Sequence, residues 1–153
     1  MRSTKPVLLV EDDSIDAMTV RRAFKDLKLT NELAHSINGE EALKYLEDPS
    51  NEPPCVILLD LNMPRMNGTE FLKVIKADEE LRKIPVIVLT TSNEERDVVE
   101  SFRLSVAGYI VKPVDYKKFV EAIRTIDMYW TLSEMPAQEL GANHVQNEAA
   151  ALN

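Results

Sequence analysis

Short apolar runs alternate along this chain with longer segments in which apolar residues recur at helical spacing. Four runs consist mainly of β-branched residues and leucine, at residues 7–10, 56–59, 86–89 and 109–111. Continuous apolar runs of this length are typical of strands that are buried on both faces of a parallel sheet. A fifth, weaker strand is predicted near residues 32–37, where interrupting polar residues favour a place at the sheet edge.

The segments between these runs carry stripes of apolar side chains, as expected for amphipathic helices that cover a sheet. The stripes comprise Ala17, Val20, Phe24 and Leu27; Phe71, Val74 and Ile75; Val98, Val99, Phe102 and Val106; and Phe119, Ile123, Ile126 and Trp130. Asn38, Ser92 and Asp115 precede three of the helical segments and are expected to act as N-caps. Strands that alternate with helices form right-handed βαβ units, so the pattern predicts an α/β fold with a doubly wound (βα)5 domain.

One domain accounts for most of the chain. The 153 residues are close to the ~150 residues of a typical single domain, and we assign this domain to residues 1–130. Residues 48–54 (DPSNEPP) are predicted to form an exposed loop. Residues 131–153 show no sustained apolar stripe and are expected to form a largely disordered tail.

Composition and charge exclude several classes of function. The net charge is −8, and no run of lysine or arginine provides the basic surface typical of nucleic-acid binding. No apolar run approaches the ~18–20 residues of a membrane span, and the early acidic residues argue against a signal peptide. Cys55 is the single cysteine, which excludes an intramolecular disulfide and disfavours a zinc site. We therefore expect a cytoplasmic protein that binds neither nucleic acid nor membrane.

Polar residues follow the strong strands, which indicates where the chemistry collects. These residues are Glu11, Asp12, Asp60, Thr90 and Lys112. In a doubly wound sheet the ligand lies at the carboxyl ends of the strands, so we expect these side chains to meet. Three neighbouring carboxylates repel one another unless a cation intervenes, and an all-oxygen cluster suits Mg²⁺. An ionised aspartate can be the nucleophile of aspartyl-phosphate chemistry, with lysine and threonine stabilising the transferred group.

Each of these residues also has a simpler interpretation when taken alone. A single aspartate after a strand is usually a helix N-cap or a turn residue. His35 lies on the predicted edge strand and is interpreted as structural. The four glycines match neither the dinucleotide-binding nor the P-loop spacing, which disfavours nucleotide binding. The polar residues at the strand ends, taken together, favour a metal-plus-carboxylate site.

Four motifs at the strand ends resemble those of the two-component response-regulator receiver family. They are VEDD at residues 10–13, LLDLNMPRMNG at 58–68, VLTTS at 88–92 and GYIVKP at 108–113. The resemblance covers about residues 5–130 and implies a flavodoxin-like, five-stranded parallel sheet of order 2-1-3-4-5. It also implies that Gly68 allows the chain to turn closely beneath the site.

The resemblance implies a role for each residue of the site. Asp60 would accept a phosphoryl group from the phosphohistidine of a sensor histidine kinase. Mg²⁺, or Mn²⁺ in its place, would be held by the side chains of Asp12 and Asp60 and by the backbone carbonyl of Asn62. Glu11 would reach the ion through water. Lys112 would pair with Asp60 and then with the phosphoryl group.

Thr90 and Tyr109 occupy the positions of the family's switch pair. The Thr90 hydroxyl would move toward the phosphoryl oxygens, and the Tyr109 ring would rotate into the space that is left. This change would remodel the surface formed by the fourth helix, the fifth strand and the fifth helix. Thr91 departs from the family pattern, because many receivers carry alanine or glycine at this position.

A narrower resemblance connects the chain with stand-alone regulators that serve bacterial phytochromes. It rests on the TTS run at residues 90–92 and on the sequence DMYWTLSEMP at residues 127–136. Relatives of that group form homodimers through the face that contains the last helix, and Phe102, Tyr129 and Trp130 are candidates for this contact. Ordinary packing of a helix on the sheet is the alternative role of these aromatic residues.

Three functions follow from these observations. The first is a stand-alone receiver, which catalyses only its own phosphorylation and dephosphorylation and is no enzyme for an external substrate. The second is a Mg²⁺ phosphohydrolase with an aspartyl-phosphate intermediate, although Asn62 stands where such an enzyme has its second aspartate. The third is a docking module that is never phosphorylated, against which the complete acceptor site argues.

Overall fold

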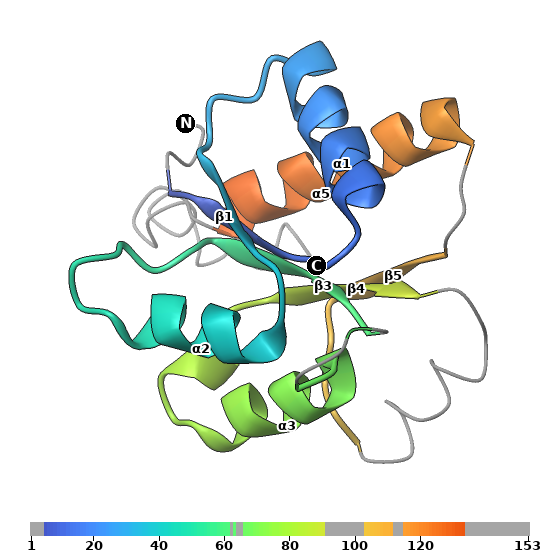
Figure 1. The fold of residues 1–153 in the computed structure, drawn as a ribbon. Coiled ribbons are helices and arrows are strands. Elements are labelled where there is room, and N and C mark those ends of the chain that lie inside the picture. The colour runs from blue at the N-terminus through green and yellow to red at the C-terminus, as the bar shows by residue number, and fades with distance from the viewer. Residues whose placement is uncertain (1–4, 62, 64–65, 91–102, 112–114, 134–153) are drawn as a thin grey trace, which may run out of the picture.

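Strands and helices alternate along the described part of the chain. The computed structural model describes residues 5–61, 63, 66–90, 103–111 and 115–133 (Figure 1). The strands are β1 (Val7–Val10), β2 (Leu33–Ser36), β3 (Val56–Asp60), β4 (Val86–Thr90) and β5 (Gly108–Val111). The helices are α1 (Ser14–Asp26), α2 (Gly39–Glu47), α3 (Gly68–Ala77) and α5 (Tyr116–Ser133), and a 3-10 turn, η1 (Leu81–Lys83), follows α3. Each strand predicted from the sequence is present.

The strands form one parallel sheet in the order β2-β1-β3-β4-β5, which confirms the predicted fold class. Every residue of β1 and β3 is buried, because these strands lie inside the sheet and have helices on both sides (Figure 1). β2 lies at an edge, and three of its four residues are only half-buried, which explains its mixed polar and apolar sequence. The architecture is therefore doubly wound and flavodoxin-like.

Helices cover both faces of the sheet, with α1 and α5 on one face and α2 and α3 on the other (Figure 1). Successive side chains of a strand point to opposite faces. Leu9 and Leu58 therefore belong to the core beneath α1 and α5, whereas Leu8 and Leu59 belong to the core beneath α2 and α3. This arrangement buries the central strands and leaves their carboxyl ends at one rim of the molecule.

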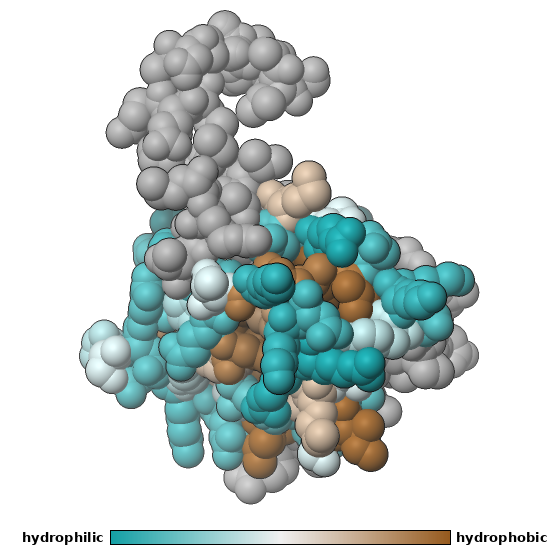
Figure 2. All heavy atoms as spheres, turned by 90° about the horizontal axis from the view of Figure 1, so that it is seen from above, coloured by the Kyte–Doolittle hydropathy of each residue, from teal (hydrophilic) through white to brown (hydrophobic). Residues whose placement is uncertain are grey.

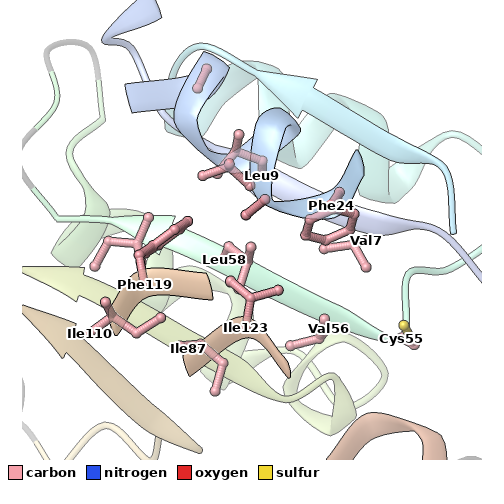
Figure 3. Packing of buried hydrophobic residues seen from close by; sticks show 14 residues of the cluster. Val7, Leu9, Phe24, Cys55, Val56, Leu58, Ile87, Ile110, Phe119 and Ile123 are labelled. Atoms are coloured by element: carbon pink, nitrogen blue, oxygen red, sulfur yellow. The ribbon is translucent and has the colours of Figure 1, made fainter. Parts of the chain in front are cut away.

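The core beneath α1 and α5 joins residues that are far apart in the sequence (Figure 3). Phe24 from α1 and Phe119 and Ile123 from α5 pack in one cluster with Leu58 and Ile87 of the sheet. Each of these side chains is at most 5% exposed, and full burial of such a side chain stabilises the fold by about 1.5–3 kcal/mol. The apolar stripes predicted for the first and last helices are confirmed at these positions.

The buried face of α3 differs from the predicted stripe at one position. Phe71 and Ile75 are fully buried, as predicted, but Val74 is 42% exposed and Leu72 is buried. The buried arc of the helix is centred between Phe71, Leu72 and Ile75, so Val74 lies on its flank. The prediction was therefore wrong at Val74.

The segment before β5 also differs from the prediction. Arg103 has a left-handed φ of 55°, and residues 104–106 are not helical, so the helical stripe that was predicted to end at Val106 was wrong there. The Val106 side chain packs against the core beneath α2 and α3. The rest of this predicted helix, including Phe102, lies outside the described residues.

The last helix extends past the predicted domain boundary. α5 ends at Ser133, whereas the tail was predicted to start at residue 131. The carboxylate of Asp115 accepts the N–H of Lys118 at 3.3 Å, in agreement with its predicted role as N-cap. The remainder of the predicted tail, residues 134–153, lies outside the described part of the chain.

The surface is mostly hydrophilic when the molecule is seen from the α1 side, with apolar groups among the charged ones (Figure 2). Within the described ranges, no helix combines the length and the apolar character that crossing a membrane would require. Cys55 is 3% exposed and belongs to the core beneath α1 and α5.

Candidate metal centre

Three carboxyl groups meet where β1 and β3 end. Glu11, Asp12 and Asp60 each offer an oxygen, and these oxygens all lie within 4.8 Å of one another. In the parallel pairing of β1 with β3, Val10 stands opposite Leu59, so the residues that follow these two come side by side. The structure brings together the three acidic residues that the sequence predicts to converge.

Burial increases the repulsion among the carboxylates of this cluster. Glu11 is fully buried and Asp60 is 4% exposed, whereas Asp12 is exposed. Like charges repel more strongly where protein replaces water around them. The cluster therefore suits a cation, and its exposed member marks the side that faces solvent.

The turn from β1 into α1 fixes the carboxylate of Glu11 and the start of the helix. The N–H of Glu11 donates to the Ser36 carbonyl at 3.0 Å, which extends the pairing of β1 with β2. Glu11 Oε2 accepts the N–H of Asp13 at 3.2 Å. Asp13 Oδ1 accepts the N–H groups of Ile15 and Asp16 at 2.8 and 3.0 Å, so Asp13 is the N-cap of α1. The sequence analysis missed this role, although an acidic residue directly before a helical stripe is its usual signal.

The loop after β3 folds back tightly against Asp60. The N–H of Leu61 donates to the Leu89 carbonyl at 3.3 Å, and the N–H of Gly68 donates to the Leu61 carbonyl at 3.1 Å. A Cβ atom on Gly68 would lie 2.5 Å from the Asp60 carbonyl oxygen and would also clash with the Leu61 Cα. Only glycine fits this approach without displacing the loop, which confirms the role that the resemblance implies for Gly68.

A capping box starts α3 immediately after this loop. The Asn67 side chain accepts the N–H of Glu70 at 2.9 Å, and the Glu70 carboxylate accepts the N–H of Asn67 at 2.9 Å. The reciprocal bonds fix the helix start relative to the loop that carries Asp60. The sequence analysis missed this box, although the spacing of Asn67 and Glu70 is its signal.

The donor set fits a small, hard cation. Mg²⁺ prefers oxygen ligands at 2.0–2.1 Å, so two oxygens that bind it directly lie at most ~4.2 Å apart. Carboxylate oxygens that all lie within 4.8 Å of one another allow direct contact from some of these groups and contact through water from another. The residues therefore agree with the cofactor expected from the sequence.

The other predicted site residues belong to the neighbouring strand ends. Thr90 is the last residue of β4 and pairs with Val111 of β5. The register of β3 with β4 places the backbone of Thr90 one position beyond the residue that pairs with Asp60. Lys112 follows Val111 directly in the sequence, and both Lys112 and Asn62 lie outside the described residues.

The predicted switch and dimer residues are placed only in part. Tyr109 is half-buried on the edge strand β5 and packs against the core beneath α2 and α3. Tyr129 and Trp130 belong to the C-terminal part of α5, and Phe102 lies outside the described ranges. The roles of these residues in switching and dimerisation stay predictions.

A histidine that the sequence analysis interpreted as structural contacts the metal centre. His35 Nε2 lies 2.7 Å from the backbone carbonyl oxygen of Glu11, and His35 Nδ1 lies 3.2 Å from Arg21 Nη2. His35 stands opposite Leu9 in the pairing of β2 with β1. The sequence spacing gives no signal for this contact, because the register of β2 with β1 decides which residue the ring reaches.

The first residue of α5 is tied to α1. The Tyr116 hydroxyl donates to the Asp26 carboxylate at 2.6 Å, and the Arg22 guanidinium lies 4.1 Å from the centre of the Tyr116 ring. Loss of solvent, together with the hydrogen bond and the charge of Asp26, raises the pKa of Tyr116 above its usual value. The phenol therefore stays protonated and acts as the donor in this contact.

Comparison with known proteins identifies relatives over most of the chain. Residues 7–124 match the family of the response regulator receiver domain. The chain is 39% identical over 137 residues to the probable methanogenesis regulatory protein FilR2 of Methanothrix harundinacea, with 86% of this chain and 88% of the relative covered. It is 38% identical over 130 residues to response regulator Rcp1 of Synechocystis, with 82% and 88% covered.

Solved structures agree with this assignment. The bacteriophytochrome response regulator RtBRR is 44% identical, with a TM-score of 0.71 and 80% of this chain and 77% of that chain covered. The phosphorylated cyanobacterial phytochrome response regulator RcpA is 34% identical, with a TM-score of 0.75 and 87% and 98% covered. The Mn²⁺-bound form of Rcp1 is 35% identical, with a TM-score of 0.72 and 84% and 95% covered.

Proposed function

This chain belongs to the response regulator receiver domain family, and we propose from that premise that it is a single-domain response regulator phosphorylated on Asp60. The observation that carries the proposal is the convergence of Asp60 with Glu11 and Asp12 at the ends of two adjacent strands. Phosphorylation of an aspartate is typical of the family, and RcpA, a similar protein, is known in a phosphorylated form. The protein would modify itself and turn over no external substrate.

A divalent cation completes the proposed site. Receiver domains bind Mg²⁺, and the similar Rcp1 has been crystallised with Mn²⁺. The side chains of Asp12 and Asp60 and the backbone carbonyl of Asn62 would hold the ion, with Glu11 reaching it through water. When bound, the ion supplies positive charge that keeps the carboxylates ionised and stabilises negative charge on a transferring phosphoryl group.

The proposed reaction is a displacement at phosphorus. A carboxylate oxygen of Asp60 attacks the phosphorus of a phosphohistidine on a sensor kinase, and an O–P bond forms as the P–N bond breaks. The electron pair of the broken bond stays on the imidazole nitrogen of the donor, which takes up a proton. Lys112 would neutralise charge on the phosphoryl oxygens, and the Thr90 hydroxyl would donate to one of them.

The proposed output is a change of the surface that contains Tyr109. Movement of the Thr90 hydroxyl toward the phosphoryl group would free space for the Tyr109 ring, which already borders solvent as a half-buried residue of β5. The change would reach the surface that the family resemblance assigns to the fourth helix, the fifth strand and the fifth helix. A homodimer through Phe102, Tyr129 and Trp130 is proposed as well.

The proposed input is a histidine kinase of a bacterial phytochrome type. RtBRR and RcpA support this proposal by similarity, since they are named as a bacteriophytochrome and a phytochrome response regulator. FilR2, which is named as a methanogenesis regulator, has a comparable identity, so a kinase test must include non-phytochrome kinases. We propose a cytoplasmic location, with which the buried, single Cys55 agrees.

Acetyl phosphate labelling tests the chemistry without a kinase. The protein is incubated with acetyl phosphate and Mg²⁺, reduced with borohydride to trap an acyl phosphate, digested and analysed by peptide mass spectrometry. We expect one modified residue, Asp60, and no modification when EDTA removes the metal. Modification at another residue would contradict the proposal, and continuous phosphate release from aryl phosphates would favour the phosphohydrolase instead.

The start of α1 gives the proposed kinase a place to bind. Ile15 and Met18 are 72% and 64% exposed, and they lie in the first turns of the helix that begins after Glu11 and Asp12. A kinase whose donor histidine reaches Asp60 must lie over this rim, so the two apolar side chains are suited to contact it. We expect Ile15→Asp to slow phosphotransfer from the most active kinase of a panel by about thirtyfold, the equivalent of an interface hot spot of about 2 kcal/mol.

The matched control for Ile15→Asp is Val74→Asp, which places the same charge on the exposed flank of α3, a helix on the opposite face of the sheet. This control should keep normal phosphotransfer, and both variants should keep normal labelling by acetyl phosphate. If Ile15→Asp lost acetyl phosphate labelling to the same extent as phosphotransfer from the kinase, the substitution would have damaged the site itself. Normal phosphotransfer to Ile15→Asp would show that the start of α1 does not contact the kinase.

A further inference from the structure

The backbone of Glu11 is held by a side chain from the edge strand. In the regular pairing of β1 with β2, the N–H of Glu11 donates to the Ser36 carbonyl, and the next donor along the ladder would be the N–H of Asn38. β2 has ended by then, since Asn38 is the N-cap of α2. At this position the side chain of His35 contacts Glu11, and its Nε2 lies 2.7 Å from the Glu11 carbonyl oxygen.

Arg21 determines which ring nitrogen of His35 carries the proton. Arg21 Nη2 lies 3.2 Å from His35 Nδ1, and a guanidinium can only donate hydrogen bonds. Nδ1 must therefore accept, so the proton of the neutral ring is on Nε2, which faces the Glu11 carbonyl. The two contacts are mutually consistent: Arg21 from α1 donates to the ring, and the ring donates to β1.

The contact acts on the peptide that joins the two acidic residues of the β1–α1 turn. The carbonyl oxygen of Glu11 belongs to the Glu11–Asp12 peptide, so its orientation fixes the direction in which the Asp12 backbone leaves the strand. The same residue is also held through its N–H by Ser36 and through its carboxylate by the N–H of Asp13. The His35 contact is the third restraint on Glu11, and among these three it is the one that acts on the carbonyl of the Glu11–Asp12 peptide.

We propose that His35, oriented by Arg21, is a positioning residue for the divalent-cation site, which it serves by holding the Glu11–Asp12 peptide. This inference rests on the proposed function, because it takes Glu11 and Asp12 as metal-binding residues. His35 reaches no ion itself. It acts as an outer partner, a type of contact whose loss weakens metal binding without removing a ligand.

Magnesium titration of the full chain tests this inference in the absence of any phosphoryl donor. The Kd for Mg²⁺ is measured by calorimetry at one fixed pH, and the thermal midpoint of the metal-free protein is measured beside it. His35→Leu removes the donor, and we expect its Kd to rise by about tenfold, the lower end of the range for outer partners of metal sites. His35→Gln keeps an N–H near the position of Nε2 and is expected to restore most of the affinity.

Arg21→Met provides a second test if His35→Leu does not fold. Arg21 is exposed, so its replacement should preserve the fold, and we expect a rise of about threefold in the Kd, less than for loss of an outer partner itself. An unchanged Kd in all of these variants, whatever their thermal midpoints, would overturn the proposal and leave His35 with a structural role. An equal rise in His35→Leu and His35→Gln would also overturn it, because the N–H would then be irrelevant. Failure of the wild type to bind Mg²⁺ would instead contradict the proposed function.

Discussion

Asp60→Asn is expected to leave the protein folded and to abolish its labelling by acetyl phosphate. Asparagine has almost the shape of aspartate, but its amide oxygen carries no charge and is a poor nucleophile. Because Asp60 is 4% exposed, a substitution of similar shape is needed to avoid disturbing the packing around it. Intact-mass spectrometry after incubation with acetyl phosphate and Mg²⁺ should detect no phosphorylated species of this variant.

Asp13→Asn is the matched control for this substitution. Asp13 lies two residues from Glu11 but serves as the N-cap of α1, and asparagine is an equally good N-cap. The control makes the same chemical change at the same edge of the sheet, outside the carboxylate cluster, and should be labelled normally. Full labelling of Asp60→Asn would exclude Asp60 as the acceptor, and failure of both variants would point to a general effect of lost negative charge.

Asp60→Asn should also change stability in a direction that reports on the cluster. Removal of one of three neighbouring negative charges relieves their repulsion, so the metal-free variant is expected to melt at a higher temperature than the metal-free wild type. Added Mg²⁺ should raise the melting temperature of the wild type more than that of the variant. Asp13→Asn should show neither change.

Gly68→Ala is expected to lower the free energy of unfolding by about 3 kcal/mol, the upper part of the range for overpacking. The added Cβ would lie 2.5 Å from the Asp60 carbonyl oxygen, and a backbone atom in a strand cannot move aside as a side-chain end can. Urea unfolding measures the loss of stability. The rate of acetyl phosphate labelling should fall as well, since the displaced backbone is that of the acceptor itself.

Gly108→Ala is the control for the alanine substitution. Among the described residues, a Cβ atom on Gly108 would meet only the Ile87 Cδ1, at 3.5 Å, which is an ordinary contact with the end of a flexible side chain. Its free energy of unfolding should stay within about 0.5 kcal/mol of the wild type, as for substitutions without a specific structural conflict. A loss in Gly68→Ala as small as the one expected for Gly108→Ala would show that the loop at Gly68 relaxes to accept the added Cβ.

The features that were predicted well from the sequence depend on the period of the hydrophobic pattern and on the polar residues that follow the strands. Continuous apolar runs identify the inner strands, because both faces of a buried strand must be apolar, and the polar residues after them mark the rim of the sheet. The strand order that the family resemblance implies makes β1 and β3 neighbours, and parallel pairing then brings Glu11 and Asp60 together, since the carboxyl ends of adjacent parallel strands coincide. The fold and the acidic centre were predictable for this reason.

The features that were missed depend on three-dimensional context. Val74 and Leu72 both fit an apolar helix surface, and only the position of α3 on the sheet decides which of them is buried. The contact of His35 with the Glu11 carbonyl depends on the register of β2 with β1 and on where β2 ends. Sequence spacing contains neither quantity, because both arise when the elements pack.

The carboxylate cluster stands at the ends of β1 and β3, the strands in which every residue is buried. Amide protons in such central strands exchange with solvent chiefly through global opening, whereas those at fraying helix ends exchange through local fluctuations. Local unfolding therefore cannot relieve the charge repulsion between Glu11 and Asp60. This repulsion enters the folding equilibrium of the entire domain, so a cation that neutralises these groups should slow exchange throughout the sheet.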